Sequence, residues 1–218
     1  MKKNLLLLTV MCMFTFPVLN AQLNQGSIMT GLTSTFGTHV MYEGGVNTGT
    51  NIFSFGVTTY KYDGEAEYRD ISFNLQPRIG YFVIDNLAVG LDFVFSSCNE
   101  KDLDDDDKWV VTMVGVGPFA RYYYPLGKIY PFVEANVAFG SMTDKEVYDD
   151  DTDTEKYGLT IFGGGVGAAV PLGDRVTFDA MLGYQSFKVK EKDTEYDWEM
   201  TAGTFGLKMG FTVFFNSK

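Results

Sequence analysis

The segment from Thr201 to Phe215 alternates for fifteen residues between large apolar side chains and small or polar ones. One parity carries phenylalanine, leucine, methionine and valine, and the other carries mainly alanine, threonine, glycine and lysine. A period of two indicates a β-strand, because successive side chains of a strand point to opposite faces of the sheet. In a soluble sheet the apolar face packs against a core. In a membrane barrel it faces lipid, and the polar set fills the interior.

The N-terminus favours the membrane interpretation. Two lysines precede an almost unbroken apolar stretch from Leu5 to Val18, and small Ala21 then offers a cleavage point. This is the pattern of a secretory signal peptide, and the stretch is too short for a stable membrane helix. We therefore expect a signal peptide over residues 1–21 and one barrel domain over residues 22–218, with a retained N-terminal anchor as the less favoured alternative.

Composition narrows the remaining classes. Aromatic residues make up 16% of the chain and there are 24 glycines, which suits an all-β protein better than a helical one. The formal net charge of -11 argues against nucleic acid as a partner, because nucleic acid binding needs basic patches. Cys98 has no second cysteine beyond the signal peptide with which to form an internal disulfide. We expect no cofactor.

Strand-like segments recur with connections of contrasting length. Short turns alternate with long polar stretches at 37–69, 98–108, 143–155 and 190–200, and this asymmetry predicts long outer loops and periplasmic termini. The sequence therefore predicts an all-β fold, an eight-stranded antiparallel up-and-down transmembrane β-barrel. The predicted strands are Gln25–Phe36, Asp70–Val83, Leu87–Ser97, Trp109–Pro125, Ile129–Met142, Lys156–Pro171, Arg175–Val189 and Thr201–Phe215.

One further segment, Asn51–Tyr62, also alternates. It either extends the first hairpin above the membrane, which we favour, or replaces one of the eight strands.

The charges in the middle of the predicted strands share the inward parity. A charge on the lipid face costs about 2–4 kcal/mol for Arg or Lys at the midplane, whereas inward charges of opposite sign can pair. They form either a polar pathway through the lumen or a structural plug, and we favour the plug because eight strands leave room for little more than side chains. These lumen charges are Arg78, Asp92, Arg121, Glu134, Asp179 and Lys208.

Aromatic residues near the strand ends predict two girdles at the membrane interfaces. Near the short turns they are Tyr81, Tyr122, Tyr124 and Tyr130, and near the long loops they are Tyr68, Trp109, Tyr157 and Trp198.

Four sequence pieces carry a resemblance to a known family: Gly80-Tyr81-Phe82, Asp85-Asn86-Leu87-Ala88-Val89-Gly90, Pro118-Phe119-Ala120-Arg121-Tyr122-Tyr123 and Pro131-Phe132-Val133-Glu134. In their order and spacing the chain resembles the porin-like outer-membrane β-barrel family, whose members are small barrels akin to outer-membrane proteins X and W and the A-type transmembrane domain. The resemblance covers the whole mature chain. It implies a location in the outer membrane of a Gram-negative bacterium but no single shared activity.

The closing strand carries a second point of resemblance. Phe211 and Phe215 lie on its outward parity, and Phe215 resembles the terminal aromatic residue that barrel-assembly machinery recognises, although residues 216–218 follow it. The expected partners are therefore outer-membrane lipid, lipopolysaccharide and this assembly machinery, with small solutes or extracellular ligands as further candidates.

Few residues of the sequence are candidates for metal binding or catalysis. The acidic runs at 104–107 and 149–153 are expected to be solvated outer loops, with Asp149, Asp151 and Asp153 as weak calcium ligands or bridges through divalent cations to lipopolysaccharide. The chain has one histidine, His39, and no Gly-x-Ser-x-Gly motif, so we expect no catalysis.

The expected function is therefore that of a non-catalytic envelope barrel that presents acidic extracellular loops for surface interaction or envelope integrity. The alternative is a narrow porin-like channel for small solutes, and a lipid-modifying barrel enzyme is third.

Overall fold

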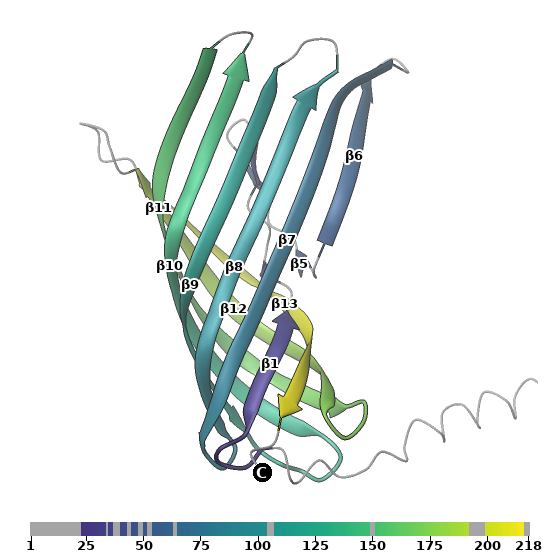
Figure 1. Ribbon diagram of the computed structural model, residues 1–218, viewed down its shortest axis with the longest axis vertical. Coiled ribbons are helices and arrows are strands. Elements are labelled where there is room, and N and C mark those ends of the chain that lie inside the picture. The colour runs from purple at the N-terminus through teal and green to yellow at the C-terminus, as the bar shows by residue number, and fades with distance from the viewer. Residues whose placement is uncertain are drawn as a thin grey trace, which may run out of the picture.

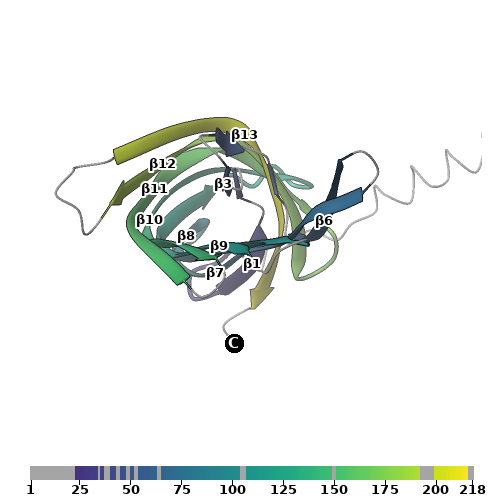
Figure 2. The same cartoon turned by 90° about the horizontal axis from the view of Figure 1, so that it is seen from above.

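The computed structural model describes residues 23–215 apart from 34, 37–39, 43–44, 48–49, 52–53, 63–64, 104–106, 149–150 and 192–198, so the predicted signal peptide lies outside the described residues. Over the described ranges every regular element is a strand, and no helix there is long and apolar enough to cross a membrane. Eight antiparallel strands close into a ring, because β1 pairs with both β13 and β7 (Figure 2). The ring strands are β1 (Ile28–Thr33), β7 (Glu65–Ile84), β8 (Leu87–Asp102), β9 (Lys108–Tyr123), β10 (Tyr130–Tyr148), β11 (Asp151–Pro171), β12 (Val176–Glu191) and β13 (Glu199–Phe215).

The strand β6 (Ser54–Tyr62) lies outside the ring. It pairs with the first half of β7, from Tyr62 opposite Glu65 to Ser54 opposite Asn74, while β1 pairs with the second half of the same edge. The segment predicted as an extension of the first hairpin is therefore an extension and not one of the eight ring strands. Four short strands stand between β1 and β6 and pair with one another: β2 (Thr35–Phe36) with β5 (Thr50–Asn51), and β3 (Val40–Tyr42) with β4 (Gly45–Asn47).

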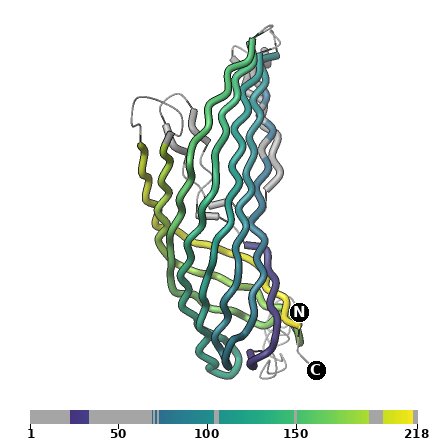
Figure 3. The backbone as a smooth tube through the Cα atoms, turned by 60° about the vertical axis from the view of Figure 1, so that its left-hand side comes forward, coloured from purple at the N-terminus to yellow at the C-terminus, as the bar shows by residue number. Residues whose placement is uncertain are grey.

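The strands from β7 to β11 rise well beyond the ends of β12 and β13 (Figures 1 and 3). The prediction of a long loop at Thr143–Glu155 is wrong, because β10 and β11 stay paired as far as Tyr148 opposite Asp151. β8 likewise continues to Asp102. These parts carry polar residues on both faces, so the apolar alternation that identifies a strand in the sequence is missing although the backbone ladder continues.

We call the mostly polar parts of β7 to β11 that are furthest from the short turns the distal sheet, which comprises residues 65–70, 97–102, 108–112, 141–148 and 151–160.

The opposite end of the barrel is closed by tight turns. Asp85 and Asn86 join β7 to β8, and Asn86 has a φ of 67°, a left-handed conformation that asparagine tolerates. The Asn86 backbone N–H donates to the Leu23 carbonyl oxygen at 2.7 Å, and the Gln25 N–H donates to Asp85 Oδ1 at 2.8 Å. The start of the described chain is thereby fastened across the short-turn end, next to the end of β13.

The outer surface of the ring carries a band of exposed apolar side chains. On the six ring strands that carry a lumen charge they have the opposite parity, and on β11 they lie opposite outward residues of β10 and β12, as Val166 does with Val133 and Leu182. We call this band the apolar belt, and its members are Ile71, Ile79, Tyr81, Val89, Leu91, Phe93, Phe95, Val114, Val116, Tyr122, Val133, Phe139, Phe162, Val166, Val170, Leu182, Tyr184, Phe205, Leu207, Phe211 and Phe215.

The predicted aromatic girdles are partly wrong. Tyr81, Tyr122 and Tyr124 are exposed on the outer face near the short turns, but Tyr130 is 1% exposed and points inward. Trp109 and Tyr157 also have the inward parity, since Trp109 lies opposite Glu146 and Tyr157 lies opposite Met142. Outward aromatic residues at that end include Phe93, Phe95, Phe139, Phe162, Tyr184 and Phe205. The side chain of Tyr68 and all of Trp198 lie outside the described parts.

Candidate functional site

The structure places all six predicted lumen charges inside the ring. They come from six ring strands, namely β7, β8, β9, β10, β12 and β13, and each exposes 5% or less of its surface. Three are cations and three are anions, so the formal charge of the group is zero. We call these six residues the charge layer. Their common inward parity follows from the ladders, in which Arg78 lies opposite Asp92 and Arg121 lies opposite Glu134.

Arg78 connects two carboxylates from different parts of the wall. Its Nε donates to Asp92 Oδ1 at 2.8 Å and its Nη2 to Asp92 Oδ2 at 2.9 Å, which is a bidentate pair with the neighbouring strand. Its Nη1 also donates to Glu134 Oε2 at 2.7 Å. Glu134 stands on β10, which is not a neighbour of β7 in the sheet, so this contact crosses the lumen.

Arg121 extends the network to the other side of the ring. Its Nε donates to Glu134 Oε2 at 2.6 Å, and its Nη1 donates to Asp179 and to the Tyr123 hydroxyl at 3.1 Å. Lys208 Nζ lies 3.7 Å from Glu134 Oε1. Glu134 therefore faces three cations and is the central anion of the layer.

Two threonine hydroxyl groups also donate hydrogen bonds to Asp179. The Thr177 hydroxyl donates to Asp179 Oδ1 at 2.6 Å, and the Thr212 hydroxyl donates to Asp179 Oδ2 at 2.8 Å. Both threonines are buried and have the inward parity. Sequence reasoning did not single them out, although their parity was the signal that could have found them.

Aromatic rings pack against both guanidinium groups. The Arg78 guanidinium carbon lies 4.4 Å from the ring centre of Phe119, and that of Arg121 lies 4.1 Å from Phe132. Two glycines make room for the Phe119 ring, because a Cβ added at Gly80 or Gly90 would lie 2.9 or 2.7 Å from its carbon atoms. The rings fill the space beside the cations that water would otherwise occupy, and they attract those cations through the ring quadrupole.

A layer of buried apolar side chains lies next to the charge layer on the side of the short turns. The Phe82 ring centre is 6.0 Å from that of Tyr123 and 6.1 Å from that of Phe214, and Tyr123 is 5.7 Å from Phe132. Met29 of β1 is fully buried in the same cluster. The lumen is therefore occupied by two successive layers of side chains, one charged and one aromatic.

A second apolar cluster lies inside the other half of the ring, towards the distal sheet. Sequence reasoning missed it, because the inward residues of that half were expected to be small or polar. Its buried members are Val111, Met113, Ala138, Met142, Leu159, Ile161, Phe187 and Val189.

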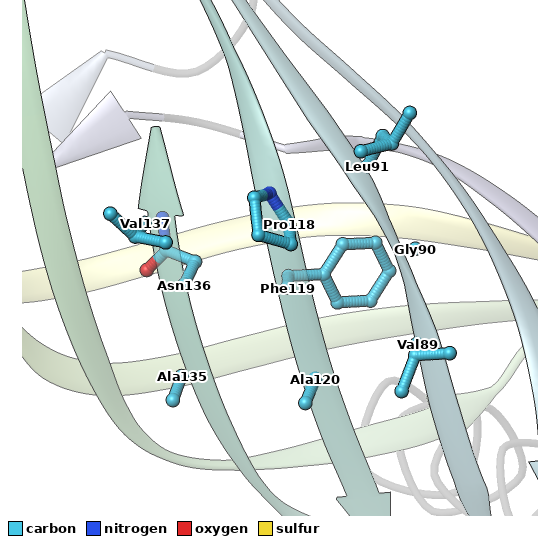
Figure 4. A pocket seen from close by; sticks show the side chains of 9 residues that line it. All are labelled: Val89, Gly90, Leu91, Pro118, Phe119, Ala120, Ala135, Asn136 and Val137. Carbon is cyan, nitrogen blue, oxygen red and sulfur yellow. The ribbon is translucent and has the colours of Figure 1, made fainter. Parts of the chain in front are cut away.

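A groove of about 670 Å³ lies in the wall formed by β8, β9 and β10 (Figure 4). It is centred on Pro118, where the β9–β10 ladder is interrupted between the pairs Phe119–Asn136 and Val116–Phe139. Proline has no N–H to donate, which accounts for an interruption at this point. None of the six members of the charge layer lines the groove, so it forms no entrance to them.

The remaining predicted residues are dispersed. Asp151 and Asp153 are exposed on β11, while Asp149 and His39 lie outside the described residues. In the part of the chain that the structure describes, no three carboxylate, imidazole or thiol groups could together hold a metal ion. Phe211 and Phe215 are exposed on the outer face of β13, and Phe211 packs edge-to-face against Phe178 with ring centres 5.5 Å apart.

Comparison with known proteins gives similarity to solved structures alone. No protein-family model matches the chain, and no curated protein matches it. Among solved structures it is similar to the outer membrane protein OprG from Pseudomonas aeruginosa, with 14% identity, 92% of this chain and 100% of that chain covered and a TM-score of 0.47. It is also similar to a major outer membrane protein from Thermus thermophilus, with 13% identity, 87% and 99% covered and a TM-score of 0.46. The N-terminal β-barrel domain of OprF from Pseudomonas aeruginosa gives 13% identity, 88% and 98% covered and a TM-score of 0.36.

Proposed function

We propose that the protein is a closed, non-catalytic barrel of the outer membrane of a Gram-negative bacterium, which presents its distal sheet and the adjoining acidic loops to the cell exterior. The observation that carries this proposal is the charge layer, in which six buried and mutually neutralising side chains extend from strand to strand across the lumen.

The membrane location is supported by the distribution of polarity. The ring exposes the apolar belt on its outside, with Phe205 70% and Val166 61% exposed, and buries arginine and glutamate on its inside. A soluble protein with this arrangement would present a large continuous apolar surface to water. Such a surface would make the protein associate or aggregate. In a bilayer the same surface contacts the hydrocarbon chains of the lipids. Charged side chains of the membrane-spanning strands are then tolerated in the lumen, away from the lipid.

The closed lumen is supported by the hydrogen bonds of the charge layer. Arg78 and Arg121 both donate hydrogen bonds to Glu134 across the lumen, so a solute would have to break several charge-assisted hydrogen bonds at once to pass. Eight strands enclose an interior that side chains just fill. The aromatic layer of Phe82, Tyr123 and Phe214 adds a second obstacle on the short-turn side.

Assembly uses the closing strand in this proposal. Phe211 and Phe215 present exposed rings on the outer face of β13, where the barrel-assembly machinery could bind them before the ring closes.

Recording of single-channel current tests the closed lumen. The mature protein is refolded into a planar bilayer, and folding of the same sample is verified by heat-modifiable migration on a gel. The expected result is the absence of reproducible current steps. A porin of about 16 strands with an open channel, measured in the same bilayer, should conduct and serves as the positive control. Reproducible steps whose size changes in Arg121→Gln would contradict the proposal and assign the charge layer to the alternative, a narrow channel.

A further inference from the structure

Gln76 on β7 and Thr33 on β1 bury polar atoms inside the ring without a partner. Gln76 is 1% and Thr33 3% exposed, and Gln76 Oε1 and Thr33 Oγ1 make no hydrogen bond within the described residues. Thr33 lies directly opposite Gln76 in the last pair of the β1–β7 ladder, and residues directly opposite share a face. Gln76 is two residues from Arg78 of the charge layer, so both side chains have the inward parity. The two atoms therefore lie inside the ring on adjacent strands, at the point where β1 ends.

The polar side chains on either side of this pair have other partners. Arg78 donates to two carboxylates of the charge layer, and Asn74 Oδ1 accepts a hydrogen bond of 2.5 Å from the Ser96 hydroxyl. The methyl group of Thr33 lies against β13, because a Cβ added at Gly210 would be 2.8 Å from Thr33 Cγ2. Buried polar groups without a partner are costly, and the large majority in folded proteins bind protein or ordered water. The two atoms therefore need a ligand that can form hydrogen bonds.

The backbone ladder is interrupted beside the same pair. β7 and β8 are paired at Leu75–Phe95 and again at Arg78–Asp92, with no pair between them. Pro77 stands in this interruption and has no N–H to donate. Buried backbone groups next to an interruption need partners just as buried side chains do. The demand for hydrogen bonds is thus concentrated at this point of the wall.

The same row of the sheet has room for a small ligand. Val94 is the residue of β8 that would face Gln76 if the ladder were continuous, and it lies opposite Gly115 on β9. A Cβ added at Gly115 would approach no atom beyond its chain neighbours more closely than 3.5 Å. The lumen therefore has space there for a group as large as a methyl, which is close to the size of a water molecule.

Layers of side chains lie on both sides of the row along the barrel axis. Towards the short turns the next inward residue of β7 is Arg78 of the charge layer. In the other direction Ser96 lies opposite Met113 and Met113 lies opposite Met142, and both methionines belong to the second apolar cluster. A ligand larger than water would have to displace one of these layers. Because the charge layer has a formal charge of zero and both unpartnered atoms are neutral, the place offers an ion no net attraction.

We propose that an ordered water molecule binds between Gln76 and Thr33, at the seam where β1 closes the ring against β7. The water donates a hydrogen bond to Gln76 Oε1 and forms a second one with the Thr33 hydroxyl. It links the side chains of the last pair of the β1–β7 ladder, where the paired part of β1 ends. The inference concerns the inside of the ring and does not depend on the role proposed for the distal sheet.

A crystal structure of the native protein, at a resolution that shows ordered water, tests the site directly. The expected result is a water oxygen within about 2.5–3.0 Å of both Gln76 Oε1 and Thr33 Oγ1. A direct hydrogen bond between the two side chains would overturn the inference, and so would a site in which no water contacts both atoms.

A double-mutant cycle supplies a second measurement. Thr33→Val and Gln76→Met keep the approximate shape of the side chains and remove the polar atoms. Each single variant leaves the water with one partner fewer, whereas the double variant removes the need for it. In a urea titration of the protein folded into vesicles, the double variant should be more stable than the sum of the single losses predicts. The expected coupling is roughly tenfold in the unfolding equilibrium constant, within the range for residues of one hydrogen-bond network.

Thr177→Val combined with Gln76→Met is the matched control. Thr177 is also a buried inward threonine, but its hydroxyl donates to Asp179. The losses of this control pair should add. Additive losses in the Thr33–Gln76 pair, or equal coupling in both pairs, would contradict the water link. If a variant does not fold, the crystal structure of the native protein decides between the two outcomes.

Discussion

Replacing Glu134 by alanine is expected to lower the free energy of unfolding by about 3–5 kcal/mol, the range for removing one partner of a buried ion pair. Glu134 accepts hydrogen bonds from Arg78 and Arg121 and lies 3.7 Å from Lys208 Nζ. Without it, three cations would remain in the lumen with only Asp92 and Asp179 to balance them. The measurement is an equilibrium urea titration of the protein folded into lipid vesicles.

A charge-balanced double variant is the control for this prediction. Removing Arg121 together with Glu134 leaves two cations and two anions in the charge layer, so the double variant should be clearly more stable than the sum of the two single losses predicts. Surface substitutions commonly change the free energy of unfolding by no more than about 0.5 kcal/mol. If the Glu134→Ala variant differs from the native protein by no more than that amount, the charge layer does not stabilise the barrel.

Replacing Leu91 by arginine is expected to destabilise the folded barrel by about 2–4 kcal/mol, the range for a cation on the lipid face near the midplane. Leu91 is 43% exposed on the outer face of β8, at the middle of the apolar belt. In a soluble barrel, replacing an exposed leucine by arginine would have little effect on stability, because the guanidinium group would remain hydrated.

Asn99→Arg is the matched control, because Asn99 lies on the same strand and the same face, eight residues further towards the distal sheet. It is expected to change the stability by no more than about 1 kcal/mol, as at the edge of a bilayer. Equal effects of the two substitutions in the vesicle titration would show that the depth along the strand does not matter, and the belt would then not face hydrocarbon.

The ring of strands could be predicted from the sequence because the lipid-facing and lumen-facing parities alternate. Thr201–Phe215 shows this most plainly, and β13 occupies Glu199–Phe215. The distal sheet could not be predicted in the same way. Around Thr143–Glu155 both faces are polar, so hydrogen bonding of the backbone continues where the apolar pattern has already ended.

The membership of the charge layer follows from parity, but its connections do not. Parity places Arg78 and Glu134 on the same side of the wall, whereas their 2.7 Å contact depends on how far the strands are staggered around the ring. The stagger also depends on a register shift between Phe82 and Ile84 that no sequence signal marks. Trp109 and Tyr130 show that residue type and distance from a strand end do not predict which side an aromatic residue faces. Their parity along the strand places both inside the ring.

Depth-dependent quenching of a single tryptophan tests the membrane-spanning barrel most directly. Trp109 and Trp198 are replaced by phenylalanine, tryptophan is introduced at Leu91 or at Asn99, and both proteins are refolded into vesicles that contain brominated lipids. The account predicts that Leu91→Trp is quenched most by bromines deep in the acyl chains and little by aqueous acrylamide, with the reverse order for Asn99→Trp. Quenching of Leu91→Trp by acrylamide and not by brominated lipid would contradict it.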